Sequence, residues 1–214
     1  MTQLRITEVF FSLQGEAKTV GLPTIFIRLT GCPLRCGYCD TAYAFTGGKM
    51  REIDDIIEYI RQWKTPYVTV TGGEPLAQPG VHELLEALAN NGYDVSLETS
   101  GAMDIADVDE RISIVMDLKT PGSGELSKNI YENCYYLGKK DQVKFVICDR
   151  ADYDWAKFKA DELRLTFKVG EILLSPSYGE LEPSDLADWI LQDQLPYRFQ
   201  VQLHKLLWKD EPGR

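Results

Sequence analysis

Three cysteines in one short segment constrain this chain more than any other feature. Cys32, Cys36 and Cys39 follow the spacing C-x3-C-x2-C. Thiolates this close in sequence can converge on one metal centre, and soft sulfur ligands favour an iron–sulfur cluster, zinc or copper over magnesium or calcium. The fold must therefore present residues 32–39 as an ordered loop that turns its three thiols to one side.

The identity of the fourth ligand distinguishes a structural zinc site from an iron–sulfur cluster. A structural zinc site needs a fourth Cys or His nearby, but Cys134, Cys148, His82 and His204 are isolated in the sequence. We interpret Cys134 and Cys148 as core thiols, because free cysteine is among the most buried residue types. The trio favours a 4Fe–4S cluster whose fourth iron is open to a ligand that is not protein. A disulfide with a spare thiol, or a small zinc knuckle, is the alternative.

The cysteine spacing resembles the hallmark of the radical S-adenosylmethionine (SAM) superfamily. That resemblance implies that the amino and carboxylate groups of SAM occupy the open iron. It also implies that one electron from the cluster cleaves SAM to methionine and a 5′-deoxyadenosyl radical.

Strand and helix patterns alternate along the chain. Strands alternating with helices predict a parallel sheet joined by right-handed crossovers. A complete eight-unit barrel takes about 250 residues, so 214 residues predict one domain over 1–214, an α/β fold with an incomplete TIM-type barrel of about six parallel strands. The expected strands are 5–11, 24–29, 67–70, 93–97, 112–116, 143–147 and 171–174, and the expected helices are 53–63, one around Leu84–Leu88, 130–137, 153–163 and 184–191.

Polar and glycine-containing motifs follow the expected strands. The cysteine segment comes directly after strand 24–29, and Thr71–Pro75 follows strand 67–70. This second segment resembles the GGEP motif with which radical SAM proteins hold the amino group of SAM. Glycines without Cβ let backbone carbonyls approach a ligand, and Glu74 adds an acceptor. Glu98 to Gly101 follow the next strand, where the superfamily often places polar contacts to SAM.

A narrower resemblance covers nearly the whole chain. Its motifs are Phe11–Glu16, Phe26–Cys32, Cys39–Thr41, Asp117–Lys119, Ser175-Pro176 and Val201–Lys205. Together they resemble the family of 7-carboxy-7-deazaguanine synthases, radical SAM carbon–nitrogen lyases of queuosine (7-deazapurine) biosynthesis. The resemblance implies conversion of 6-carboxy-5,6,7,8-tetrahydropterin to 7-carboxy-7-deazaguanine with release of ammonia. It further implies that SAM is regenerated and that Mg²⁺ is required.

The resemblance also implies a set of site residues. A substrate carboxylate calls for a fixed cation, and Arg28 can offer a bidentate fork. Thr41 carries a hard oxygen that suits Mg²⁺. The expected cluster and metal ligands are Cys32, Cys36, Cys39 and Thr41. The expected SAM contacts are Tyr38, Cys39, Asp40, Gly73, Glu74, Glu98, Ser100, Lys119, Thr120, Pro121, Ser175, Pro176, Ser177 and Tyr178. The expected substrate contacts are Leu13, Gln14, Gly15, Glu16, Arg28, Thr71 and His204, the last taken to lie at a strand end.

The net charge and the hydrophobic pattern limit which kinds of partner the protein can have. A formal net charge of −10 argues against a nucleic-acid partner, which usually meets a basic patch. No apolar run approaches the about 20 residues of a membrane span, and no signal-peptide pattern opens the chain, so we expect a cytoplasmic protein. The family implies a pterin substrate, a flavodoxin- or ferredoxin-type reductant and a homodimer. In part of the family the chain ends soon after the His-Lys pair, whereas residues 210–214 extend further here.

Two rival functions remain at this point. A glycyl-radical activating enzyme shares the cysteine spacing and the GGEP-like turn, but it acts on a protein backbone and needs neither the Gln14–Glu16 loop nor Cys39–Thr41. A non-catalytic iron–sulfur or zinc module would not need SAM-shaped turns on successive strands.

Overall fold

A single continuous sheet organises the computed structural model, which describes residues 2–209, 211 and 213. Within these residues the strand order is β3-β1-β2-β4-β5-β6-β7-β8-β9. The strands are β1 (Gln3–Leu13), β2 (Pro23–Leu29), β3 (Lys49–Glu52), β4 (Tyr67–Gly72), β5 (Asp94–Thr99), β6 (Ser113–Asp117), β7 (Gln142–Ile147), β8 (Glu171–Pro176) and β9 (Arg198–Phe199). Positions 210, 212 and 214 of the C-terminal extension lie outside the described residues.

The pairing confirms the predicted fold class. Every neighbouring pair from β2 through β4, β5, β6, β7 and β8 to β9 is parallel. Only β1 runs antiparallel to its neighbours β2 and β3. Because β3 and β9 stand at opposite ends of the order, the sheet is an open barrel of six long parallel strands with a hairpin at one edge.

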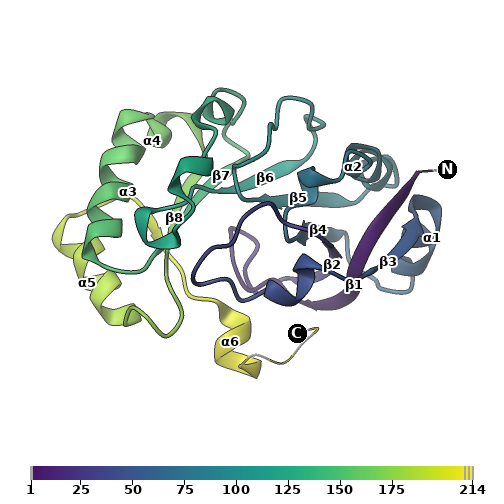
Figure 1. Cartoon of the computed structure of the whole chain (residues 1–214), viewed down its shortest axis with the longest axis horizontal. Helices are drawn as coiled ribbons and strands as arrows, with labels where there is room; N and C mark the ends of the chain where they lie inside the picture. Colours follow the sequence, from purple (N-terminus) through teal and green to yellow (C-terminus); the bar gives the residue numbers. More distant parts are fainter. Residues whose placement is uncertain (1, 210, 212, 214) are drawn as a thin grey trace.

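Helices cover the outer face of this sheet (Figure 1). They are α1 (Ile53–Ile60), α2 (Val81–Asn90), α3 (Arg150–Glu162), α4 (Leu165–Lys168) and α5 (Pro183–Gln192). The remaining helix, α6 (Leu203–Trp208), lies apart from these and next to the loop that follows β1. Short 3-10 turns are η1 (Ala42–Phe45), η2 (Pro75–Ala77), η3 (Pro121–Ser123), η4 (Leu126–Lys128) and η5 (Tyr131–Tyr135). In α1, Ile53, Ile56, Ile57 and Ile60 form one buried stripe, which is the pattern of a helix that packs on a sheet.

Three local predictions are wrong. Residues 130–137 form no α-helix: the 3-10 turn η5 lies there, because the buried Asn133 amide donates to Met103 O (2.8 Å) and ties the segment to a neighbouring loop. His204 lies on α6 rather than at a strand end. Cys148 follows β7 and is partly exposed, whereas Cys134 is buried in the core as predicted.

The loop between β1 and β2 enters the barrel. Gln14 N donates to Leu22 O (2.9 Å) and Gly21 N donates to Gln14 O (2.8 Å), which closes the neck of the loop. At its tip Ala17 is buried against Val115 and Leu173. Such a loop fills space that side chains fill in a complete barrel, and it becomes the floor of the cavity above it.

In the described part of the chain, no helix has the length and apolar character that a membrane crossing requires.

Candidate functional site

A cavity of about 550 Å³ opens at the carboxyl ends of the parallel strands. This is the edge at which parallel α/β folds place their chemistry. Of the residues predicted for the site, all but Glu74, Thr120 and Pro121 line it. The lining residues among the predictions are Leu13, Gln14, Gly15, Glu16, Arg28, Cys32, Cys36, Tyr38, Cys39, Asp40, Thr41, Thr71, Gly73, Glu98, Ser100, Lys119, Ser175, Pro176, Ser177, Tyr178 and His204.

The cysteine loop is held by its own backbone and by one apolar anchor. Cys39 N donates to Cys36 O (3.2 Å) and Gly31 N donates to Ala44 O (2.8 Å). Leu34 is 1% exposed and pins the loop to the protein. Burial raises the pKa of the Cys32 and Cys36 thiols. A bound cationic centre reverses that preference, because it stabilises the thiolate.

The donor set fits a four-iron cluster better than a single ion. Among the described residues, no three His, Cys, Asp or Glu side chains gather around one point as a single metal ion requires. Each thiolate of a 4Fe–4S cluster binds a different iron, so its ligands stand farther apart than those of one ion. Three partly buried thiols on one cavity wall match such a cluster and leave one iron for an outside ligand.

Gly73 lets the end of β4 lie against the cysteine loop. A Cβ at Gly73 would stand 2.3 Å from Gly31 O and 2.7 Å from Cys32 Cβ. No real Cβ tolerates such contacts, so only glycine permits this approach. Glu74 N donates to Gly31 O (2.8 Å) and fastens the two segments together.

The Glu74 side chain points into the protein rather than into the cavity. Its carboxylate accepts hydrogen bonds from Leu76 N (3.0 Å), Thr99 Oγ1 (3.0 Å), Ser100 N (2.7 Å) and Ser100 Oγ (2.5 Å). The residue is fully buried. Glu74 therefore braces the ends of β4 and β5, which carry the cavity residues Gly73 and Ser100.

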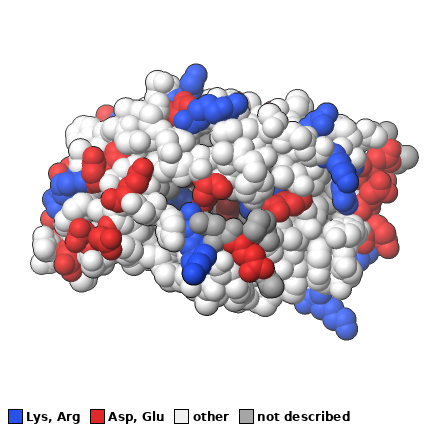
Figure 2. Space-filling model, turned by 60° about the horizontal axis from the view of Figure 1, so that its bottom comes forward, with Lys and Arg blue, Asp and Glu red and all other residues white. Residues whose placement is uncertain are grey.

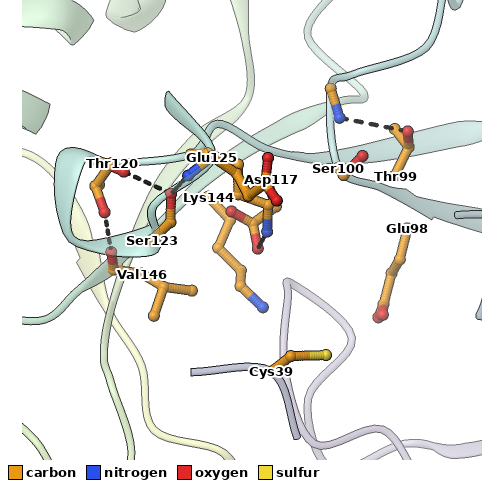
Figure 3. Close-up of polar contacts among 12 residues, drawn as sticks. Cys39, Glu98, Thr99, Ser100, Asp117, Thr120, Ser123, Glu125, Lys144 and Val146 are labelled. Atoms are coloured by element: carbon orange, nitrogen blue, oxygen red, sulfur yellow. Dashed lines mark hydrogen bonds and ion pairs between the residues drawn. The ribbon is translucent and has the colours of Figure 1, made fainter. Parts of the chain in front are cut away.

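Two carboxylates and a lysine form the cavity floor. Lys144 of β7 makes an ion pair with Glu16 Oε2, and Gln202 Nε2 donates to Glu16 Oε1 (2.7 Å). Glu98 of β5 accepts from Thr71 Oγ1 (3.1 Å) and lies 3.5 Å from Gln14 Nε2. Figure 3 shows the ends of Lys144, Glu98 and Cys39 around one open space.

The floor carboxylates differ in their readiness to ionise. Burial opposes ionisation of Glu16, but Lys144 outweighs it and lowers the pKa of Glu16. Burial and then the charge of Glu16 raise the pKa of Glu98. Burial would lower the pKa of Lys144, but Glu16 and Asp117 raise it overall. Of the two floor carboxylates, Glu98 therefore takes up a proton at a higher pH than Glu16 does.

Arg28 presents the free end of its guanidinium to the cavity. Its Nε donates to Glu8 Oε1 (2.7 Å), and the Tyr43 hydroxyl donates to the same oxygen (2.8 Å). The guanidinium carbon lies 5.8 Å from the Phe10 ring centroid and 5.9 Å from that of Tyr43. Among the described residues, neither terminal nitrogen of Arg28 has a hydrogen-bond partner, which leaves the fork open to an anion.

Two unsatisfied polar atoms mark another part of the wall. Tyr38 OH and Asp117 Oδ1 are buried and lack a hydrogen-bond partner among the described residues, although both residues line the cavity. Asp117 Oδ2 pairs with Lys119 Nζ (3.0 Å), which lies 5.7 Å from the Tyr38 ring centroid. Because buried polar groups are normally satisfied, this wall fits a polar ligand.

Thr120 and Pro121 belong to a structural turn. The Thr120 hydroxyl lies 3.0 Å from two acceptors, Val146 O and Asp152 Oδ2. Ser123 Oγ donates to Thr120 O (2.6 Å), and Figure 3 shows Thr120 between Val146 and Ser123. Thr120 is buried and Pro121 is exposed, and neither lines the cavity. Of the predicted segment 119–121, Lys119 alone reaches the cavity.

The C-terminal helix α6 joins the floor to the cysteine loop. Leu203 N donates to Gly15 O (3.0 Å), and Lys205 Nζ pairs with Asp40 Oδ2 (3.1 Å). A Cβ at Gly15 would lie 2.3 Å from His204 Nδ1. Burial lowers the pKa of His204, so the imidazole favours its neutral form.

Sequence reasoning missed several lining residues. They are Phe10, Phe26, Leu34, Phe45, Gly72, Thr99, Val115, Asp117, Lys144, Val146 and Gln202. Lys205, the last residue of the Val201–Lys205 motif and a candidate together with His204, also lines the cavity. Lys144 carried a usable signal, because a lysine in an otherwise apolar strand must find a polar interior or solvent. Gln202 lies in the Val201–Lys205 motif, but its contact with Glu16 depends on how residues far apart in the chain come together.

Comparison with known proteins gives a consistent result. The model of the radical SAM superfamily matches residues 26–121. A 7-carboxy-7-deazaguanine synthase of Koribacter versatilis is 39% identical over 97% of this chain and 98% of its own length. One of Chlorobaculum tepidum is 41% identical over 97% and 96%. The crystal structure of QueE from Escherichia coli covers 94% of both chains with a TM-score of 0.74 at 23% identity, which supports the partial-barrel fold.

Proposed function

Because the chain belongs to the family of 7-carboxy-7-deazaguanine synthases, which are radical SAM enzymes, we propose that it converts 6-carboxy-5,6,7,8-tetrahydropterin to 7-carboxy-7-deazaguanine and ammonia. The main observation in support of this proposal is that three features predicted from the sequence line the same cavity. Three thiols, an open Arg28 fork and the Gln14–Glu16 loop all line it. Neither a glycyl-radical activating enzyme nor a non-catalytic metal module needs that combination, and the relatives favour the synthase.

Cys32, Cys36 and Cys39 would hold the cluster, and the wall formed by Tyr38, Gly73 and Lys119 would hold SAM. When bound, the cluster and SAM supply one-electron chemistry that removes a hydrogen atom from an unreactive carbon. The protein's part is to fix the ligand beside the substrate and to exclude water. Glu74 contributes from behind this wall, through its hydrogen bonds to Thr99 and Ser100.

The substrate would lie between Arg28 and the floor loop. The terminal nitrogens of Arg28 would form two parallel hydrogen bonds with the pterin carboxylate. Glu16, whose pKa is lowered because Lys144 outweighs burial, would accept hydrogen bonds from the amino-pyrimidine edge. Glu98, whose pKa is raised by burial and by Glu16, would hold a proton at its carboxyl oxygen near the departing nitrogen.

We also propose that Thr41 supplies an oxygen ligand to Mg²⁺. Its hydroxyl lies at the cavity wall, 3.8 Å from Cys39 Sγ. Mg²⁺ keeps several waters and needs few protein ligands. Asp40 is a poorer candidate, because its carboxylate already meets Lys205 and Gln202.

The remaining parts of the proposal concern partners and location. We propose a single domain, a homodimer in solution, a one-electron flavodoxin- or ferredoxin-type reductant and a cytoplasmic setting. Figure 2 shows acidic side chains toward both ends of one face. The first turn of α1 carries Asp54 and Asp55, and that of α5 carries Asp185. Together with the net charge of −10, this distribution supports a small-molecule substrate over a phosphate backbone.

An anaerobic turnover assay tests the proposal. The protein reconstituted with iron and sulfide is mixed with reductant, SAM, Mg²⁺ and the carboxylated tetrahydropterin. We expect ammonia and the deazaguanine chromophore in equal amounts, with SAM largely unconsumed. A reconstituted protein that cleaves SAM but yields no ammonia from this pterin would contradict the proposal, and a Cys36→Ala variant is the control for nonenzymatic product.

A further inference from the structure

Lys144 is a partly buried cation to which neither the motifs nor the names of the relatives assign a role. It lies in β7, where Val143, Phe145 and Ile147 are fully buried on the helix side. The alternation of the strand turns Lys144 and Val146 to the barrel interior, and both line the cavity. In the register of the sheet Lys144 stands beside Asp117 of β6. A lysine in that position requires a partner.

The lysines nearest to Lys144's own partners do not serve all of the neighbouring carboxylates in direct contact. Lys119 pairs with Asp117 and Lys144 pairs with Glu16, while the hydrogen-bond partners of the Glu98 carboxylate among the described residues are Thr71 and Gln14. Three carboxylates therefore share two lysines. The ionisable groups that face Lys144 and its partners are Glu16 of the floor loop, Arg28 of β2, Cys39 and Asp40 of the cysteine loop, Glu98 of β5, Asp117 and Lys119 at the end of β6, and His204 and Lys205 of α6.

From this geometry we infer that Lys144 is a positioning residue that assigns the negative charge of the floor to Glu16 and leaves the proton of the floor on Glu98. Two carboxylates in one low-dielectric site cannot both ionise freely. The ammonium group contacts Glu16 and points across the same space as Glu98 (Figure 3). Its position therefore decides which carboxyl group accepts hydrogen bonds and which can donate one.

The inference gives a direction for each carboxyl group when Lys144 is changed. Burial and the neighbouring Asp40 both favour the protonated form of Glu16. Without Lys144, the Gln202 amide is the one side chain in the described part of the structure that still donates a hydrogen bond to the Glu16 carboxylate. Glu16 then takes up a proton at higher pH and loses an acceptor that the amino-pyrimidine edge would use.

The first test needs no substrate. Carboxylic-acid C=O bands are followed by infrared spectroscopy during a pH titration of the reconstituted protein, and are assigned with Glu16→Gln and Glu98→Gln. In the wild type we expect the Glu98 band to appear at higher pH than the Glu16 band. In Lys144→Met the Glu16 band should move up by about one pH unit or more, which is a tenfold change in proton affinity. Lys144→Arg, which keeps the charge, should titrate like the wild type.

The second test rests on the proposed function. The dissociation constant of 6-carboxy-5,6,7,8-tetrahydropterin is measured anaerobically with SAM and without reductant. Binding is measured across the pH range of the infrared titration. Lys144→Met should bind about tenfold more weakly one pH unit below the pH at which its Glu16 band titrates, and should recover above that pH, while the wild type and Lys144→Arg should change no more than about twofold at the same pH. Lys157→Met, which removes a surface ion pair with Asp193, is the matched control.

The outcomes separate the two ideas. If Lys144→Met leaves both carboxyl bands where the wild type has them, the inference is overturned whatever the pterin does. If Lys144→Met and Lys144→Arg lose affinity equally at every pH, Lys144 only fills space and the inference is likewise wrong. If the bands shift as expected but the wild type does not bind the pterin, the inference stands and the proposed substrate fails.

Discussion

Gly15 and His204 are in contact although they stand near opposite ends of the chain. A Cβ on Gly15 would lie 2.3 Å from His204 Nδ1 and 3.3 Å from its Cε1. The backbone of Gly15 also accepts a hydrogen bond from Leu203 N (3.0 Å). Glycine is thus required here by the close approach of α6, and the contact sets the width of the cavity beside the floor loop.

A methyl group at Gly15 tests this contact. We expect Gly15→Ala to displace His204 and to weaken pterin binding about tenfold, because small misplacements in a preorganised site are costly. Iron content should be unchanged, because the cysteine loop is held elsewhere. Binding titration together with iron analysis measures both effects. Gly138→Ala is the control, since its Cβ would meet only Asp141 at 3.9 Å. Equal affinity in the Gly15 and Gly138 variants would show that α6 adapts.

Arg28 is expected to bind the substrate carboxylate. Arg28→Ala should weaken pterin affinity about 30-fold, the effect of losing a charge-assisted pair of hydrogen bonds. Arg28→Lys should recover only part of the affinity, because an ammonium cannot form the fork. Cluster content and SAM binding should match the wild type in both variants. Wild-type pterin affinity in Arg28→Ala would refute the carboxylate-binding role.

The cysteines divide into two groups that can be tested against each other. Replacing Cys32, Cys36 or Cys39 by Ala should abolish the cluster absorbance and all SAM cleavage, because a 4Fe–4S cluster with two protein ligands is not retained. Cys134→Ala and Cys148→Ala should keep iron, sulfide and turnover. Iron and sulfide assays on the five variants decide the matter. Loss of the cluster in Cys134→Ala or Cys148→Ala, without unfolding, would require a different ligand set.

We expect the Glu74 side chain to stabilise the fold rather than to contact the ligand directly. Glu74→Ala leaves buried donors on Leu76, Thr99 and Ser100 without a partner and should lower the free energy of unfolding by about 3 kcal/mol. Urea denaturation of the apoprotein measures this directly. Glu83→Ala, on the exposed face of α2, is the control. If Glu74→Ala keeps wild-type stability but loses SAM binding, the carboxylate serves the ligand rather than the fold.

The sequence predicted the sheet better than it predicted the loops. Short apolar runs that end in polar or glycine-containing turns located the six long parallel strands, because several of these strands are buried along nearly their whole length. The segment 130–137 misled the prediction, since its apolar residues have helical spacing but Asn133 draws its hydrogen bonds from a distant loop. The position of His204 on a helix could not be foreseen from a segment of six residues that packs on the other end of the chain.

The residues of the candidate site were also predicted unevenly. Cys32, Arg28 and Gly73 were found because motif and strand end coincide, and all three line the cavity. Thr120 belongs to a motif but turns its hydroxyl to Val146. Lys144 belongs to no motif, and its importance emerges only when β7 places it beside Glu16. Motifs therefore identify the loops of such a site, whereas its charge balance depends on side chains that strands bring in from elsewhere.

The entry of residues 14–22 into the barrel affects the order in which the protein can fold during translation. Ala17 N is held by Gln200 Oε1 (2.9 Å) and Lys18 N by Gln142 Oε1 (2.8 Å). A chain leaving the ribosome N-terminus first presents its cysteines long before these two glutamines emerge. The cysteine segment is thus available early, while the loop of residues 14–22 can be fixed in place only after Gln142 and Gln200 have been made.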